Sequence, residues 1–203
     1  MNPTALLEQP LPKPRRDLVG YASARALEAL LEAQIALRFL EEGYTRNAAG
    51  KAFQAWRALT ATLLALERDI VEMLGEKEKR WLEEVGVPRV PSSRLKPLAR
   101  LIEEAAGVPY YTHLTSTALE IHDYQYHGPD PSGELSKYPD RGEAARDIAS
   151  ILGKLAEIVE EQVKPRLESQ GKWTREHQEA LQRLHEKLRE RRHAATETRQ
   201  TMA

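Results

Sequence analysis

The sequence predicts an all-α protein, a bundle of helices with one long amphipathic helix appended at the C-terminal end. Apolar residues recur at spacings of three and four through most of the 203 residues, most clearly over residues 26–66. Charged residues make up 30% of the chain and aromatic residues 6%, a composition typical of long amphipathic helices. No segment shows the paired, alternating patterns of strands, so we expect a protein without a sheet.

Residues 26–66 predict a helical hairpin. The first helix should span residues 17–43 and end at Gly43, because glycine readily adopts the left-handed conformation that closes many helices. The second should begin at Thr45 and run to Gly75. Its first turns are rich in alanine, which allows close approach of the backbones, so we expect the two helices to be antiparallel.

Three further helical segments follow the hairpin. Residues 76–85 should stay helical until the Gly-Val-Pro sequence at residues 86–88 stops them. The serines at residues 92–93 should cap a helix over residues 95–106. Residues 110–126 contain strand-favouring Thr and Tyr, but their neighbours and their apolar spacing favour a helix.

A long loop over residues 128–140 precedes the next helix. Asp140 and Glu143 have the spacing of a capping box, which predicts a helix over residues 141–167 with a kink at Pro165.

The last helix should begin at Thr174 and carry only a narrow apolar seam, so we expect it across the outside of the bundle or against a second subunit. The seam consists of His177, Leu181, Leu184 and Leu188. The chain then divides into a proline-rich arm (residues 1–16), a helical bundle (residues 17–168) and a C-terminal helix and tail (residues 169–203).

The composition limits the kinds of site and partner that the protein can have. A net charge of −1 gives no overall attraction for nucleic acid or acidic membranes, so any phosphate contact needs a local patch. The absence of cysteine excludes disulfides, zinc–thiolate sites and cysteine nucleophiles. No apolar run is long enough to cross a membrane and no signal peptide is recognisable, so we expect a cytoplasmic protein. Scarce Asn and Cys with many charges is typical of thermophile proteins.

Three motifs resemble a known superfamily. The hairpin resembles the first hairpin of HEPN (higher-eukaryote and prokaryote nucleotide-binding) domains, on Leu30, Ala33, Leu37, Gly43, Tyr44, Ala49, Lys51, Ala52, Ala55 and Leu59. A Lys-Tyr-Pro-Asp segment at residues 137–140, followed by the helix over residues 141–152, is a second match. The stretch over residues 122–130 looks most like the archaeal PaREP family within that superfamily, and the likeness covers residues 19–167.

This resemblance implies an antiparallel HEPN-like bundle, a homodimer, and a role in RNA cleavage, toxin activity or nucleotide binding. HEPN nucleases carry an Arg followed by four to six residues and a His. None of the six histidines here has an Arg at that spacing, and the nearest substitutes are Lys172 before His177 and Lys187 before His193. Lysine lacks the planar guanidinium group that binds a phosphate through two hydrogen bonds, so we assign no catalytic residue.

A ligand-binding site is predicted around residues 120–130. Tyrosines there can stack on a base and histidines can donate to phosphate, with cations from the second helix beside them. The predicted ligand-binding residues are His122, Asp123, Tyr124, Tyr126, His127, Lys137, Tyr138, Arg46 and Lys51. The two histidines are five residues apart, which is not the one-turn spacing of helical zinc pairs, so we predict no metal and no cofactor.

Several interpretations stay open. The same polar residues can instead anchor the long loop through buried hydrogen bonds. The basic end of the last helix, over residues 187–193, complements the helix dipole and could also touch nucleic acid. The leading hypothesis is a non-catalytic nucleotide- or RNA-binding module that acts as a dimer. The alternatives are a degenerate HEPN ribonuclease using His122 or His127, and a structural protein whose role is dimerisation.

Overall fold

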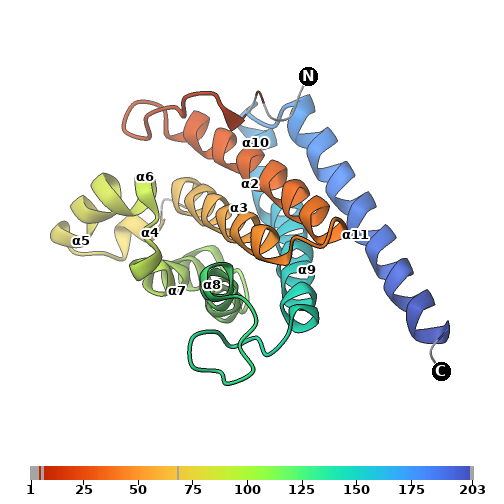
Figure 1. Cartoon of the computed structure of the whole chain (residues 1–203). Helices are drawn as coiled ribbons and strands as arrows, with labels where there is room; N and C mark the ends of the chain where they lie inside the picture. The colour runs from red at the N-terminus through yellow and green to blue at the C-terminus, as the bar shows by residue number, and fades with distance from the viewer. Residues whose placement is uncertain (1–4, 6, 68, 202–203) are drawn as a thin grey trace.

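A computed structural model describes residues 5, 7–67 and 69–201, and throughout these residues the regular structure is helical, without a strand. Two long helices, α2 (Leu18–Glu41) and α3 (Thr45–Leu66), form the hairpin that the sequence predicts (Figure 1). The prediction of an all-α protein is therefore confirmed.

Local chemistry explains the two ends of α2. Asp17 caps α2, and its carboxylate accepts a hydrogen bond from the Gly20 N–H at 2.7 Å. At the other end Gly43 has a φ of +81°, the left-handed conformation expected of it. The turn closes when the Tyr44 N–H donates to the Phe39 carbonyl at 2.8 Å.

The second helix is shorter than predicted. α3 ends at Leu66 rather than at Gly75, because Glu67 takes an extended conformation and its carboxylate pairs with Arg166 at 2.9 Å. The short helices α4 (Asp69–Glu72) and α5 (Glu76–Trp81) follow in its place.

The predicted stop at residues 86–88 is also wrong. From α5 the chain continues through a π-helical turn, η1 (Leu82–Gly86), into α6 (Val87–Arg89). Pro88 lies in the first turn of α6, directly after this π-helical turn, so the helical path continues past the proline. α6 ends at Arg89, and the next residue, Val90, is left-handed with a φ of 40°.

The next two helices occupy the predicted residues. α7 (Leu95–Ala106) agrees with the expected span, and α8 (Tyr111–His127) confirms a helix where strand-favouring residues competed. The expected serine cap is wrong, because residues 92–94 form a 3₁₀ turn, η2, and Arg94 takes the cap position of α7 without a side-chain bond.

After the loop, α9 (Arg141–Ile158) begins with half of the predicted capping box. The Asp140 carboxylate accepts from the N–H groups of Gly142 and Glu143 at 2.6 and 2.9 Å. The Glu143 side chain turns instead to Arg146.

The path of α9 runs on through a π-helical segment, η3 (Val159–Val163), into α10 (Lys164–Ser169). Pro165 lies in the first turn of α10, so the irregular turn precedes the proline and the helical path reaches beyond residue 167.

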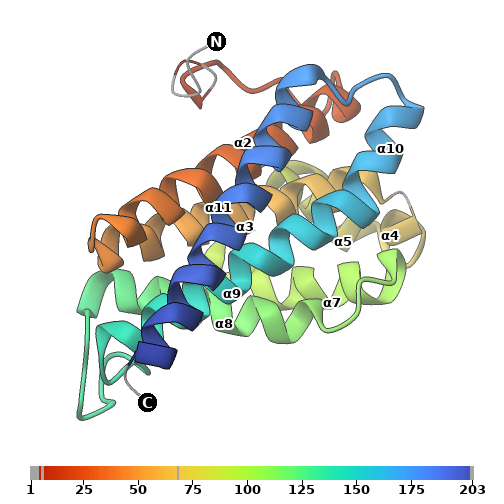
Figure 2. The ribbon, with the colours of Figure 1, turned by 90° about the vertical axis from the view of Figure 1, so that its right-hand side faces the viewer.

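The last helix, α11 (Arg175–Thr201), lies across the outside of α2 and α9 (Figure 2). Its predicted seam is buried, with His177, Leu181, Leu184 and Leu188 all in the core. Two polar contacts fasten it to α2: His177 Nε2 lies 2.8 Å from the Ser23 carbonyl oxygen, and Gln34 donates to the Ala180 carbonyl at 2.9 Å. Of the proline-rich arm, residues 9–12 lie beside α2, while residues 1–4 and 6 are outside the described part.

The centre of the core is α3, which contacts α2, α7, α8 and α9. The Trp56 ring stacks on the Tyr111 ring with centroids 4.9 Å apart. The Trp56 Nε1–H donates to the Thr115 hydroxyl at 3.0 Å, and Thr60 shares a 2.8 Å hydrogen bond with the Tyr111 hydroxyl. This packed, paired interface holds α3 and α8 in one fixed arrangement. Among the described residues, no helix is long and apolar enough to span a membrane.

Candidate functional site

The predicted site falls on two different sides of α8. Tyr124 is 1% exposed and points into the core, whereas Tyr126 is 59% exposed. Neighbouring positions along a helix differ in direction by about 100°, so two residues apart places side chains on nearly opposite faces. The stretch over residues 120–130 therefore places Tyr124 in the interior and Tyr126 on the surface.

The inner side of this motif anchors the long loop. The Tyr124 ring meets the Tyr138 ring edge-on, with centroids 5.6 Å apart. The Tyr138 hydroxyl donates to the Asp147 carboxylate at 3.0 Å, and burial, with Asp147 beside it, raises the pKa of that hydroxyl. Both tyrosines are buried, so neither offers a face to a ligand in this conformation.

A single carboxylate organises the rest of the loop. Asp130 accepts hydrogen bonds from the Ser132 hydroxyl at 2.6 Å and from the Leu135 N–H at 2.6 Å, and these bonds lower its pKa. Its own N–H donates to the Tyr138 carbonyl at 2.8 Å. The loop over residues 128–140 is thus held by its own polar groups and by the bundle.

The outer side of α8 presents His122 and Tyr126 together. The His122 ring stacks on Phe53 with centroids 3.9 Å apart and an interplanar angle of 15°, and the Tyr126 ring meets it edge-on at 5.1 Å. His122 Nδ1 is buried, and within the described part of the chain it has no hydrogen-bond partner. Burial lowers the pKa of His122, although the nearby Gln125 acts in the opposite direction. Burial therefore favours the neutral form of the imidazole.

The two predicted cations on α3 also reach this region. Arg46 donates from Nε to the Gln125 carbonyl at 3.0 Å and from a terminal nitrogen to the Tyr126 carbonyl at 2.5 Å. It thereby pairs two carbonyls at the end of α8, which have no partner inside the helix. Lys51 pairs with the largely buried Glu32 at 2.9 Å. Both cations have a structural partner, yet both border open space.

That open space is a groove of about 640 Å³, which we call the α3–α8 groove. It is lined by Phe39, Arg46, Asn47, Gly50, Lys51, Gln54 and Gln125. Asn47, Gly50, Lys51 and Gln54 recur at helical spacing and so form one face of α3. A Cβ on Gly50 would come within 2.9 Å of the Gln125 side chain, so the glycine leaves room for that side-chain amide.

Sequence reasoning found two residues of this lining, Arg46 and Lys51, and missed its three amides. The missed amides belong to Asn47, Gln54 and Gln125. Their spacing on α3 was a usable signal, but side-chain amides are common on solvated helix faces. Three other predicted residues, Asp123, His127 and Lys137, are exposed and do not line the groove. Within the described residues, no three His, Asp or Glu side chains are grouped so that they could hold a metal ion.

The geometry defines an all-helical protein whose α3 and α8 frame a polar groove. A sequence model of the archaeal PaREP1/PaREP8 family matches residues 24–149, more than half of the chain, and the protein belongs to this family. No curated protein and no solved structure matches the chain. The matched residues contain the whole α3–α8 groove together with His122 and Tyr126, whereas α10 and α11 lie beyond them.

Proposed function

We propose that this protein is a HEPN-like, non-catalytic module that binds a nucleotide or RNA in the α3–α8 groove. The observation that carries the proposal is the convergence of three side-chain amides, two cations and an aromatic ring on one open groove. Tyr126 adds a second exposed ring beside the groove, because it borders His122 and its carbonyl is bound by the groove residue Arg46.

These groups match the chemistry of a nucleotide. Single-stranded bases are recognised by stacking on aromatic rings and by hydrogen bonds to their edges, for which amides supply both donors and acceptors. Arginine and lysine supply the cations that a phosphate needs. Arg46 and Lys51 are held in place by partners of their own, so the groove is organised before a ligand arrives.

A binding role accounts for these residues better than a hydrolytic one. His122 is stacked on Phe53 where burial lowers its pKa, and the Arg–His spacing of HEPN nucleases is missing from the sequence. The resemblance to HEPN proteins also carries the expectation of a homodimer, formed through one face of the hairpin and the last helix. Light scattering on the purified protein tests that part directly.

Fluorescence anisotropy with a labelled 12-nucleotide single-stranded RNA, and competition by ATP, tests the binding proposal. The test variants are Asn47→Ala and Tyr126→Ala, since neither side chain is buried. Tyr110→Ala is the matched control, because Tyr110 is 71% exposed at the opposite end of α8 and does not line the groove.

We expect Tyr126→Ala to weaken binding about tenfold, the effect of losing one base-stacking ring of about 1–3 kcal/mol, while Tyr110→Ala leaves it unchanged. The same reactions, resolved on a gel, report cleavage. If the wild type cleaved the RNA and His122→Ala did not, the ribonuclease alternative would be supported in place of the binding proposal. Absence of binding to either probe would leave dimerisation as the remaining role.

A further inference from the structure

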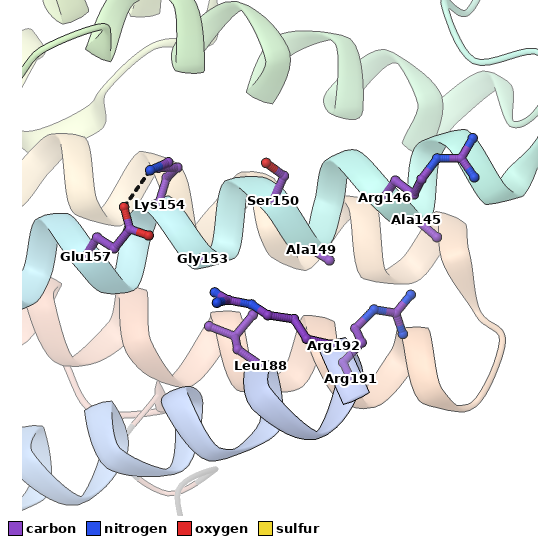
Figure 3. Close-up of a pocket in the computed structure, with 10 residues that line it drawn as sticks. All are labelled: Ala145, Arg146, Ala149, Ser150, Gly153, Lys154, Glu157, Leu188, Arg191 and Arg192. Atoms are coloured by element: carbon purple, nitrogen blue, oxygen red, sulfur yellow. Dashed lines mark hydrogen bonds and ion pairs between the residues drawn. The ribbon is translucent and has the colours of Figure 1, made fainter. Parts of the chain in front are cut away.

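A second groove lies between α9 and the C-terminal half of α11, and we call it the α9–α11 groove (Figure 3). It encloses about 590 Å³. Its lining residues are Ala145, Arg146, Ala149, Ser150, Gly153, Lys154, Glu157, Leu188, Arg191 and Arg192. None of these residues belongs to the α3–α8 groove, and most lie outside residues 24–149, so the family match does not account for them.

Small residues on α9 make the space. Ala145, Ala149 and Gly153 fall at four-residue intervals and form one strip along the helix. Leu188 is buried and fixes α11 at this distance from α9. A Cβ on Gly153 would lie 3.7 Å from a terminal nitrogen of Arg192, so that guanidinium passes directly over the glycine.

The rim of the groove is strongly cationic. Figure 3 shows Arg146 and Lys154 on α9 and Arg191 and Arg192 on α11 around the same opening. Glu157 is the one carboxylate in the lining, and Lys154 binds it at 2.6 Å. Arg146 pairs with Glu143 across one turn, and among the described residues Arg191 makes no ion pair. The lining therefore carries four positive charges and one negative charge.

The ion pairs at this rim do not neutralise it. The Lys154–Glu157 and Arg146–Glu143 pairs join half-exposed side chains one turn apart on the same helix. Such pairs are weak in water and exchange readily for a stronger anion. A phosphate group offers that anion, since it accepts several charge-assisted hydrogen bonds at once and suits the planar fork of arginine.

We propose that the α9–α11 groove binds the phosphate groups of a ligand that carries two or more of them in succession. Arg146 and Lys154 are eight residues apart, which places them about 12 Å apart along α9 at 1.5 Å per residue. Arg146 turns toward Glu143 and Lys154 toward Glu157, in opposite directions along the helix, so the two charged ends lie apart (Figure 3). Two cations spaced in this way suit a short chain of phosphates. Arg191 reaches the same opening from α11, and Ser150 is a further polar residue of the lining on α9.

Two sources share this chemistry: a free polyphosphate group, as in a nucleoside triphosphate, and the backbone of single-stranded RNA. Inorganic tripolyphosphate, titrated by calorimetry, represents the first, and a 12-nucleotide single-stranded RNA in anisotropy represents the second. The site does not depend on the α3–α8 groove. Each titration is therefore repeated on Asn47→Ala, which alters only the other groove.

The test protein is the double variant Arg146→Gln/Arg191→Gln, which removes one cation from each helix of the rim. The matched control is Arg183→Gln/Arg189→Gln, which removes the same charge from exposed positions of α11 outside the groove. Circular dichroism checks that both variants keep the helical content of the wild type. Arg192 is left unchanged, because it already interacts within the chain.

We expect the test variant to weaken tripolyphosphate binding tenfold or more, the effect of losing charge-assisted hydrogen bonds, and the control to change it less than about twofold. The wild-type affinity should fall steeply with added salt. If the test variant lost affinity only for RNA, the groove would bind an RNA backbone. If it lost affinity for both RNA and tripolyphosphate, the groove would bind phosphate groups in general. No binding of either probe to the wild type, or equal loss in test and control variants, would overturn the proposal.

Discussion

Tyr124 and Tyr126 belong to one short motif, yet they serve different parts of the molecule. Tyr124 is buried against Tyr138 and supports the loop, while Tyr126 is 59% exposed beside His122 and the α3–α8 groove. The difference arises from helix geometry rather than from residue chemistry, since the side chains are identical. A residue type that can bind a base does so only where the helix turns it toward open space.

The largest expected effect is on the stability of the protein, which should depend on Tyr124 far more than on Tyr126. Tyr124→Ala should lower the free energy of unfolding by about 3–5 kcal/mol, because it removes a large buried ring and leaves a cavity. Tyr126→Ala should change it by less than about 0.5 kcal/mol, because the ring is mostly in solvent. Urea unfolding followed by circular dichroism measures both. Equal losses in the two variants would break the comparison.

The next effect tests how firmly α8 is held against α3. Thr115→Val keeps the shape of the side chain but leaves the Trp56 indole N–H without its acceptor. An unpaired buried donor costs about 1–3 kcal/mol, so the unfolding midpoint should move to a lower urea concentration with an unchanged slope. Thr117→Val, a partly exposed position on the same helix, is the control. A shift of equal size in the control would contradict a specific role for this hydrogen bond.

His122 and His177, whose pKa values are both lowered by burial, extend the comparison to pH. Burial lowers the pKa of His177 and of His122 below the ordinary value, so each charges more easily in the unfolded chain. The unfolded state therefore binds more protons, and stability should fall as the pH drops below about 6.5 until the lowered pKa values are passed.

His177 should dominate this dependence, because both of its nitrogens have partners: Nε2 faces the Ser23 carbonyl, and Nδ1 lies 2.8 Å from the Thr174 hydroxyl. A doubly protonated ring loses its acceptor nitrogen. His177→Gln should flatten the change in unfolding free energy between pH 7.5 and 5.5, and the exposed His113→Gln should not. A wild-type stability that rises on acidification across this range would refute the assignment.

The smallest expected effect concerns one amide of the groove. Asn47→Ala should weaken RNA binding about threefold to tenfold, the size of one neutral hydrogen bond, and leave the unfolding free energy nearly unchanged. Anisotropy and urea unfolding on the same preparation measure both. If the variant changed the free energy of unfolding but not the affinity for RNA, Asn47 would have a structural role and not a binding role.

Much of this fold was predictable from local sequence patterns. The hairpin, α7 and α8 and the buried seam of α11 follow from apolar spacing and from Gly43. The end of α3 was not readable, because Glu67 leaves the helix toward Arg166, a partner 99 residues away. The direction of Tyr124 was in principle readable, since Ala118, Ile121 and Tyr124 share a buried face.

The groove itself was only partly predictable. Arg46 and Lys51 stood out by charge, but the groove also includes Gln125 of α8, whose side-chain amide lies against Gly50 of α3. The two helices meet through contacts between distant parts of the chain, such as the stacked Trp56 and Tyr111 rings. A pattern within one helix does not predict such contacts.

Photocrosslinking tests the central claim most directly, because it locates the ligand on one side of α8. A single-stranded RNA with 4-thiouridine is irradiated on the wild-type protein, and the modified peptides are identified by mass spectrometry. Adducts on Phe39, Tyr126 or the α3 residues between positions 46 and 54 are the predicted result. Adducts that occur only outside these residues, at RNA concentrations that saturate binding, would contradict the account.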